Sequence, residues 1–234
     1  MSGIRLASGE SAAGEASARG DVIVLIDALR ATTTITTALA HGIRAVIPVA
    51  KVEDCIGELT AGERGGQKLP GVDLDNSPRS FLSDSHRGKR LTITTTNGTR
   101  CLEAAATHPM AIVLLGAFVN LTATARAAER IAAHYGKDIT MLAAGRLKED
   151  AVEDNLTAEL MAEVIRSGEP AAPSDIHLKT FLEGGSGRNL LNLGLREDID
   201  FCARLDEFDL VPVYRNGKCR PLAADEPPLH GFPG

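Results

Sequence analysis

The 234-residue sequence has no tryptophan, and aromatic residues make up only 3% of it. Because hydrophobic residues still account for 44% of the chain, we expect a sizeable core built from Ala, Leu, Ile and Val. The longest apolar run, 111–119, is too short to cross a membrane. Residues 1–20 lack the apolar region of a signal peptide. The length fits one large domain or one domain with an appendage.

Clustered cysteines and basic surfaces are also missing. The four cysteines, at positions 55, 101, 202 and 219, form no Cys-x-x-Cys pair, so neither a zinc site nor a disulfide framework is indicated and we expect a cytoplasmic protein. The formal net charge is −6, and no basic stripe is present to follow a nucleic acid. An anionic substrate would therefore need local arginines or a metal ion. The composition is compatible with a homodimer.

Strand-like and helix-like segments alternate through the first two thirds of the chain. This alternation predicts an α/β protein, a three-layer α/β/α fold whose sheet is mostly parallel and covered on both faces. We expect strands at 22–26, 45–49, 91–95, 111–115 and 139–143. We expect helices at 32–40, 52–61, 99–106, 121–134 and 150–166.

The remaining segments do not follow this rhythm. The long polar segment 62–89 is interpreted as a functional or disordered loop. Helices are expected at 174–183 and 197–205, a hairpin at 210–214 and 218–222, and a flexible glycine-rich connection at 183–188. We predict a disordered or extended segment at 1–20, a single domain at 21–222 with two similar halves as an option, and a flexible tail at 223–234.

Residues 91–99, LTITTTNGT, have the pattern of a phosphate pocket. A β-branched strand ends in threonines, and Asn97, Gly98 and Thr99 precede an alanine-rich segment. Hydroxyls at a strand end, a glycine that lets the backbone approach closely, and free N–H groups at a helix start all favour an anion. The alternative is a threonine-rich strand followed by an ordinary capped helix.

A second segment of similar design occupies residues 21–42. An apolar strand ends at Asp27 and is followed by Arg30 and Thr32. A carboxylate at the carboxyl end of a buried strand lies where open α/β sheets place their ligands, so Asp27 is a candidate cation ligand beside an anion site. The alternative is that Asp27 caps the helix and that Arg30 is its salt-bridge partner.

Three more polar groups need a joint explanation. They are the Gly-Glu-Arg-Gly-Gly segment 62–66, the Asp-Asn-Ser-Pro segment 75–78, and the stretch from Gly145-Arg146 to Glu153-Asp154. Of the five groups, three follow predicted strand ends, so we expect them at one edge of the sheet. The two groups in the 62–89 loop are expected to fold over that edge.

Six segments, in order along the chain, carry a resemblance to a known family: IDALRATTTITTAL, GERGGQKLPGVDLDNSP, TTTNGTR, LLGAFVN, AAG ahead of VEDN, and LGLREDIDFCARLDEFDLVPVYRNG. The chain resembles the 2-phosphosulfolactate phosphatase family, magnesium-dependent acid phosphatases of coenzyme M biosynthesis. The resemblance covers about residues 21–217. It implies Mg²⁺-dependent hydrolysis of the phosphate ester of a small sulfonated hydroxy acid, on the family's α/β fold.

With this resemblance, the polar residues take expected roles. Carboxylates suit Mg²⁺, and forked guanidinium groups suit planar anions. The expected metal ligands are Asp27, Glu63, Glu153 and Asp154, and the expected catalytic residues are Asp27, Glu63 and Asp154. The expected substrate-binding residues are Arg30, Thr32, Arg64, Asn76, Ser77, Thr95, Thr96, Asn97, Gly98, Thr99, Asn120 and Arg146.

Several of these roles have structural alternatives. The alternative for Glu63 and Arg64 is a pair that only shapes a loop, and the alternative for Glu153-Asp154 is an exposed helix pair. Asn76 and Asn120 lie beside turn signals and are also explained as turn residues. No side chain stands out as a covalent nucleophile, so an aspartyl-phosphate on Asp27 and direct attack by metal-activated water both stay open.

The sequence departs from the family pattern at a few positions, which bears on the substrate. Lys148 and Glu159 stand where the family usually has glycine-bearing turns, and Val72 replaces an aromatic residue. These changes leave the phosphatase class intact. The alternative function is a catalytically weak anion- or sulfonate-binding protein. A phosphoryl transferase or nucleotide-binding enzyme is the least supported, because the chain lacks GxxxxGK[ST] and GxGxxG.

Overall fold

The computed structural model describes residues 2–108, 111–145 and 151–223. The strands are β1 Ile4–Ser8, β2 Val22–Ile26, β3 Ala45–Pro48, β4 Leu59–Arg64, β5 Gln67–Lys68, β6 Arg90–Thr94, β7 Ile112–Gly116, β8 Ile139–Ala143, β9 Pro212–Arg215 and β10 Lys218–Pro221. The α-helices are α1 Gly9–Arg19, α2 Ala31–Ala40, α3 Gly98–Ala105, α4 Leu121–Tyr135, α5 Val152–Ser167, α6 Asp175–Glu183, α7 Gly185–Asn192 and α8 Arg196–Cys202. Short 3₁₀ helices are η1 Pro78–Phe81, η2 Asp84–His86 and η3 Phe118–Asn120.

One sheet contains all ten strands, in the order β1-β8-β2-β7-β9-β10-β3-β6-β4-β5. The strands β1, β8, β2 and β7 form one parallel block, and β3, β6 and β4 form another. The predicted C-terminal hairpin, β9–β10, lies between the blocks and pairs antiparallel with β7 and with β3. The two parallel blocks therefore run in opposite directions along the order of the sheet.

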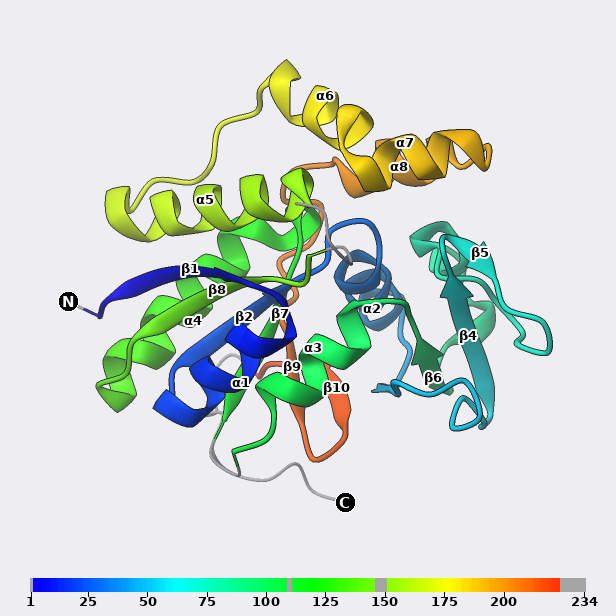
Figure 1. Cartoon of the computed structure of the whole chain (residues 1–234), viewed down its shortest axis with the longest axis horizontal. Coiled ribbons are helices and arrows are strands. Elements are labelled where there is room, and N and C mark those ends of the chain that lie inside the picture. The colour runs from blue at the N-terminus through cyan, green and yellow to red at the C-terminus, as the bar shows by residue number, and fades with distance from the viewer. Residues whose placement is uncertain (1, 109–110, 146–150, 224–234) are drawn as a thin grey trace.

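Sheet twist brings the carboxyl ends of the two blocks together. Neighbouring strands rotate by roughly 20–25°, so the five steps from β2 to β6 accumulate about 100–125°. The end of β6 therefore turns toward the end of β2 instead of pointing to the opposite edge. Gly98, just after β6, is in contact with Asp27, just after β2. Figure 1 shows α2, which follows β2, beside the β4–β5 hairpin.

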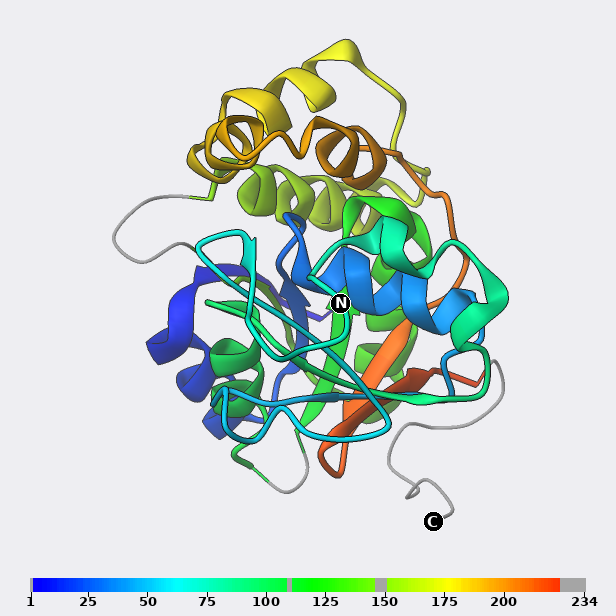
Figure 2. The ribbon, with the colours of Figure 1, turned by 90° about the vertical axis from the view of Figure 1, so that its right-hand side faces the viewer.

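Helices cover both faces of the sheet, as the three-layer prediction requires. Along β2, Val24 and Ile26 face a core shared with α4, α5 and α6–α8, whereas Ile23 and Leu25 face a core shared with α1, α2 and α3. This arrangement explains why β2 is apolar at every position. Figures 1 and 2 show α6, α7 and α8 grouped together beyond α5 and α2.

The predicted strands are all present, and four of the five predicted helices in the first two thirds are present with ends shifted by one or two residues. The helix predicted at 52–61 was wrong, because β4 begins at Leu59. This strand pairs in parallel with β6 and buries Leu59 and Ala61, and such non-local pairing overrides local helix propensity. The predicted 62–89 loop contains the end of β4, all of β5 and the two 3₁₀ helices η1 and η2.

The flexible connection predicted at 183–188 was also wrong. These residues lead into α7, and Gly187 serves close packing, since a Cβ atom there would lie 1.8 Å from the Phe181 carbonyl oxygen. The glycine allows α7 to pack against α6, so its role is steric. The tail predicted at 223–234 lies outside the described residues except for residue 223.

The N-terminal segment 1–20 differs from its prediction, because it contains α1 as well as the extended strand β1. β1 pairs with β8, and Ala13 and Ala16 of α1 are buried against the sheet. These small residues give α1 little apolar signal, so its helix depends on a tertiary contact. None of the helices in the described part of the chain is long and apolar enough to cross a membrane.

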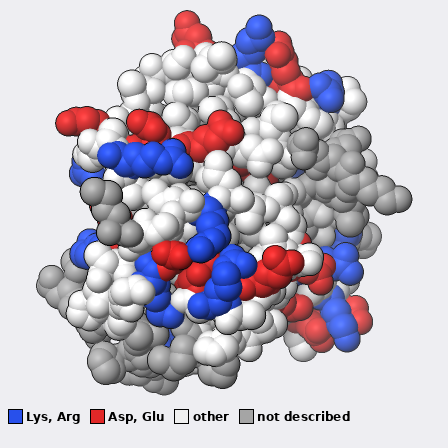
Figure 3. Space-filling view, turned by 60° about the vertical axis from the view of Figure 1, so that its left-hand side comes forward, with Lys and Arg blue, Asp and Glu red and all other residues white. Residues whose placement is uncertain are grey.

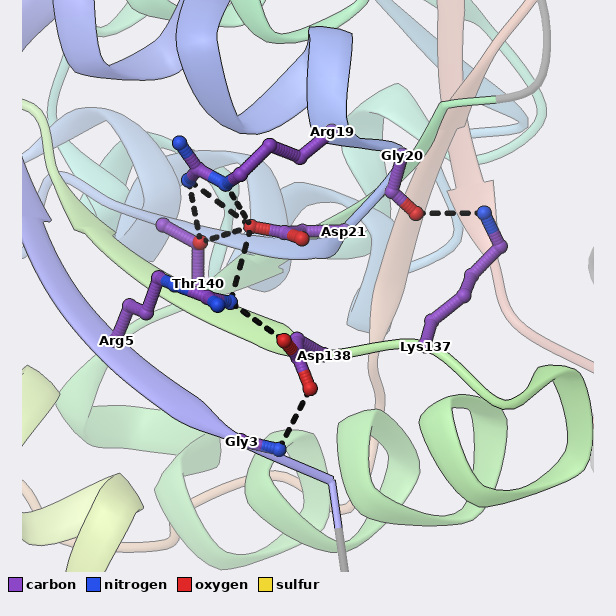
Figure 4. A network of polar contacts seen from close by, with 8 residues as sticks. All are labelled: Gly3, Arg5, Arg19, Gly20, Asp21, Lys137, Asp138 and Thr140. Atoms are coloured by element: carbon purple, nitrogen blue, oxygen red, sulfur yellow. Dashed lines mark hydrogen bonds and ion pairs between the residues drawn. The ribbon is translucent and has the colours of Figure 1, made fainter.

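A polar network fixes this N-terminal segment to the strands beside it. Arg5 of β1 donates to Asp138 at 2.8 Å and forms an ion pair with Asp21 at 3.8 Å. Figure 4 shows Arg5 between these two carboxylates. Arg19 and Thr140 also bond to Asp21, whose side chain is buried. Among the described residues, Figure 3 shows acidic and basic side chains mixed on the face that it presents. The role of this network is therefore structural: it links the N-terminal segment to residues at the start of β2 and β8.

Candidate functional site

A cavity of about 340 Å³ lies where the strand ends of the two blocks meet α7. Its size suits a small molecule. Its lining combines carboxylates, one guanidinium, amides and hydroxyls with two leucines. The lining residues are Asp27, Leu29, Arg30, Glu63, Gly65, Gly66, Asn76, Thr96, Asn97, Ser186, Asn189 and Leu190.

Asp27 is held at the end of β2 by the turn into α2. The Thr32 hydroxyl donates to the Asp27 carbonyl at 2.9 Å, and the Ala31 N–H donates to Oδ1 at 3.4 Å. Gly98 belongs here because a Cβ atom on it would lie 2.6 Å from Asp27 Oδ2. Removal from solvent, and then the charge of Glu63, raises the pKa of Asp27 to about 7. The carboxylate therefore carries a charge that its surroundings do not fully stabilise.

Glu63 is fixed by three donors from neighbouring elements. The Thr96 N–H and the Gly66 N–H each donate to its carboxylate at 2.7 Å, and the Thr96 hydroxyl donates at 2.9 Å. A carboxylate that accepts several hydrogen bonds from N–H and O–H groups is held in one orientation. Glu63 is thus positioned across the cavity from Asp27, and its pairing with Arg64 as a loop-shaping ion pair is not what the structure shows.

Arg30 lines the cavity but is paired with a residue that the sequence did not indicate. Its Nη1 donates to Asp198 at 2.6 Å and its Nη2 donates to the Gly66 carbonyl at 2.8 Å. Arg30 is 3% exposed and Asp198 2%. The alternative in which Arg30 pairs with Asp27 was therefore wrong. Asp198 was missed because its partner lies 168 positions away. It belongs to the segment LGLREDIDFCARLDEFDLVPVYRNG, which carries part of the family resemblance and is the signal that could have indicated it.

Asp198 also accepts from the Ser77 hydroxyl at 2.7 Å. This bond joins α8 to the segment that precedes η1, so Ser77 acts through Asp198 instead of lining the cavity. A buried carboxylate with two donors, one of them cationic, is a rigid junction between distant segments.

Glu153 and Asp154 are buried in the first turn of α5, behind Asp27, so the exposed-pair alternative was wrong. Asp154 accepts from the Ala28 N–H at 2.8 Å. Removal from solvent, followed by the charges of Glu153 and Asp27, raises the pKa of Asp154 well above its ordinary value. Neither residue lines the cavity. The charge of Glu153 nevertheless raises the pKa of Asp27 from behind the cavity wall.

Most of the threonines predicted to bind an anion instead form hydrogen bonds with other residues of the protein. Thr95 Oγ1 accepts from the Thr99 N–H, and the Thr99 hydroxyl donates back to the Thr95 carbonyl. The Thr32 hydroxyl donates to the Asp27 carbonyl. Only Thr96 and Asn97 of the 95–99 segment line the cavity. The prediction that Asp27 and residues 95–99 come together was correct, but fewer hydroxyls face the cavity than the pattern predicted.

Two further predicted residues lie away from the cavity. The Arg64 guanidinium donates to the Thr94 hydroxyl and to the Ala50 carbonyl. The Asn120 amide donates to the Leu115 and Leu210 carbonyls and accepts from the Ala117 N–H. Both side chains are thus occupied by structural bonds. Arg146 lies outside the described residues.

The contribution of α7 was not foreseen. Ser186, Asn189 and Leu190 line the cavity opposite the strand ends. Asn189 Nδ2 donates to the Gly65 carbonyl at 2.9 Å, which links α7 to the tip of the β4–β5 hairpin. The Gly-Ser-Gly composition that suggested a flexible loop in fact permits the close contacts of a helix beside a cavity.

The residues present fit a metal that needs few protein ligands. In the described ranges no three His, Cys, Asp or Glu side chains lie close enough together to hold an ion, so the four predicted carboxylate ligands do not form one cluster. Asp27 and Glu63 do line the same cavity. Mg²⁺ is commonly held by one or two carboxylates together with substrate phosphates and waters. The donor set therefore fits Mg²⁺ through Asp27 and Glu63.

A three-layer α/β fold with an acidic cavity at the carboxyl ends of its strands is typical of an enzyme that acts on a small molecule. The model of a family described as 2-phosphosulpholactate phosphatase matches residues 10–217, and the chain belongs to this family of phosphoric monoester hydrolases.

Relatives support the same assignment. A probable 2-phosphosulfolactate phosphatase of Caldanaerobacter subterraneus subsp. tengcongensis is 36% identical over 85% of this chain and 89% of the relative. Proteins with the same description from Clostridium novyi (32% identical, 86% and 92% covered) and Thermotoga maritima (31% identical, 83% and 89% covered) are also similar.

Proposed function

We propose that this protein is a Mg²⁺-dependent phosphatase that hydrolyses 2-phosphosulfolactate, or a close anionic analogue, by metal-assisted phosphoryl transfer to water. The observation that carries the metal requirement is the charge of the cavity. Asp27 and Glu63 face it, and Arg30, the guanidinium among its lining residues, is already paired with Asp198. A phosphate dianion would meet a net negative surface there. A divalent cation reverses that balance.

The chain's own residues supply the positioning. Asp27 and Glu63 would hold the ion, and Thr96 and the Gly66 N–H fix Glu63 in place. Arg30 presents its buried guanidinium at the cavity wall, where it can orient an anionic oxygen. When bound, Mg²⁺ supplies neutralisation of phosphate oxygens, which is the main requirement of a loose phosphoryl-transfer transition state.

The family match supports a phosphate monoester that also carries a sulfonate and a carboxylate, as the relatives' names specify. The cavity volume is compatible with a molecule of this size. A role in coenzyme M biosynthesis and a cytoplasmic location stay predictions, as does a homodimer.

A phosphate-release assay tests this function. The purified chain is given 2-phosphosulfolactate and a panel of phosphorylated hydroxy acids, with Mg²⁺ or with EDTA. We expect phosphate release that EDTA abolishes and added Mg²⁺ restores. Tight sulfolactate binding without any hydrolysis would instead favour the anion-binding alternative. Release that is unchanged in EDTA would refute the metal requirement while leaving the phosphatase class in place.

A further inference from the structure

We infer that Asn76 holds the attacking water through its Oδ1 atom. This inference rests on the proposed function and assigns a role that the carboxylates and Arg30 do not fill. Asn76 lines the cavity together with Asp27 and Glu63, and it is only 3% exposed. Its Oδ1 is buried and has no hydrogen-bond partner among the described residues. Buried acceptors normally have a partner, so a lone one beside a cavity indicates a ligand atom.

The backbone around Asn76 is held firmly. The Thr34 hydroxyl donates to the Asn76 carbonyl at 3.2 Å. The next residue, Ser77, donates to Asp198 through its hydroxyl and to Asp75 through its N–H. The main chain is therefore anchored on both sides while the side-chain oxygen is left without a protein donor. Such a preorganised group is suited to orienting a reactant.

The chemistry of the reactants identifies what Oδ1 can accept from. An amide oxygen needs an N–H or O–H donor. Near neutral pH the phosphate, carboxylate and sulfonate of the proposed substrate are ionised, so they offer acceptors and not donors. Water is the reactant that carries O–H donors. Asp27 and Glu63 already provide the carboxylates that suit Mg²⁺.

The step at Asn76 is a hydrolysis with no change of oxidation state. One O–H of the water donates to Oδ1, which leaves an oxygen lone pair free to attack phosphorus. The water oxygen forms the new P–O bond as the ester P–O bond breaks, and the electron pair of that bond stays on the ester oxygen. One water proton passes to this oxygen and the other stays on phosphate, which gives the hydroxy acid and hydrogen phosphate.

Steady-state kinetics of Asn76→Ala and Asn76→Asp test the assignment, with 2-phosphosulfolactate as substrate and Mg²⁺ varied. For Asn76→Ala we expect kcat to fall about 10- to 100-fold, because the water is no longer held in line. KM and the Mg²⁺ activation constant should stay within about two-fold of wild type. Because Oδ1 has no hydrogen-bond partner among the described residues, removing it breaks no hydrogen bond there, and thermal unfolding should show no loss of stability. Asn76→Asp keeps an oxygen acceptor and should recover most of kcat, with a higher KM from its added charge.

The exposed Asn192, at the end of α7, provides the matched control, and Asn192→Ala should leave kcat and KM unchanged. A rise in KM alone in Asn76→Ala would overturn the inference in favour of substrate binding, and a rise in the Mg²⁺ activation constant would do so in favour of metal ligation. Loss of the fold in Asn76→Ala, or Asn76→Asp as slow as Asn76→Ala, also contradicts it. A wild-type protein that releases no phosphate refutes the proposed function itself, whereas an active wild type with an unaffected Asn76→Ala refutes only this inference.

Discussion

At the scale of single residues, the site concentrates negative charge where solvent is scarce. Asp27 has Glu63 across the cavity and Glu153 behind it, and both raise its pKa. Arg30 does not offset this charge, because Asp198 holds it at 2.6 Å. Like charges gathered in a partly desolvated site favour either a proton or a cation. The folded protein is therefore less stable without that cation than its packing alone would make it.

Asp27→Asn should abolish activity and yet stabilise the metal-free protein at high pH. The pKa of Asp27 is about 7 in the folded protein against an ordinary 3.8, so between these values the folded state binds more protons than the unfolded state. The contribution of Asp27 to the wild-type unfolding free energy thus falls as pH rises from about 4 to about 7 and then levels off. In EDTA at pH 8 the variant should gain on the order of 1–3 kcal/mol, and near pH 4 almost nothing. Urea unfolding at both pH values measures the difference.

Asp73→Asn is the control of opposite sign. The Thr60 hydroxyl and N–H hold the pKa of Asp73 below its usual range, so its charge stabilises the folded state. This variant should lose stability at pH 8. An Asp27→Asn protein that is folded and still turns over substrate would remove Asp27 from the metal site.

At the scale of secondary-structure elements, the cavity is closed by the β4–β5 hairpin and by α7. The sequence predicted that residues 62–66 fold over this edge, but as a loop, and it did not place α7 there. The tip of the β4–β5 hairpin, Gly65 and Gly66, lies against α7, and Asn189 of α7 bonds to it. Arg30 bonds to the same tip from the other side. The hairpin tip therefore sets the distance between α7 and the strand ends.

Gly66→Ala should disturb this closure. Gly66 has φ +90°, and a Cβ atom would lie 2.9 Å from Leu193 Cδ1 and 3.0 Å from Asn189 Nδ2. We expect kcat/KM to fall about 10- to 100-fold, because the Leu193 and Asn189 side chains must move and the hydrogen bond from Asn189 to the Gly65 carbonyl is disturbed. Gly71→Ala is the matched control, since Gly71 has φ +82° and no neighbouring atom within 4 Å. Gly71→Ala should lose roughly 1–2 kcal/mol of stability to backbone strain, with no fall in kcat/KM. Equal kinetic effects of the two variants would show that strain alone matters.

At the scale of the whole molecule, the β9–β10 hairpin makes one sheet of two parallel blocks that run in opposite directions. Asp27 comes from one block and Glu63 from the other, so the cavity exists only while both blocks are joined. The accumulated twist across the hairpin, not the strand order itself, brings their carboxyl ends together.

The four buried, free cysteines report whether the blocks unfold together. Burial raises the pKa of each thiol, that of Cys101 to about 12, so native protein should react slowly with a thiol reagent. Because the hairpin is bonded to both blocks, we expect all four thiols to become reactive at the same urea concentration. Pulse labelling followed by mass spectrometry measures this. Labelling of Cys55 at a lower urea concentration than Cys219 would show that the β3–β6–β4 block opens on its own.

The sequence by itself determined the layers and most of the elements, because buried strands such as β2 need apolar residues on both faces and helices such as α4 need a periodic apolar stripe. It also indicated Asp27 and Asn97, which follow predicted strand ends, and Glu63, which lies in a segment expected to fold over the same edge of the sheet, as site residues. Only the tertiary structure decided that Asp198 holds Arg30, that α7 closes the cavity, and that Arg64 and Asn120 serve the scaffold. These facts depend on contacts between residues far apart in the chain and on the twist of the sheet, which no local pattern encodes.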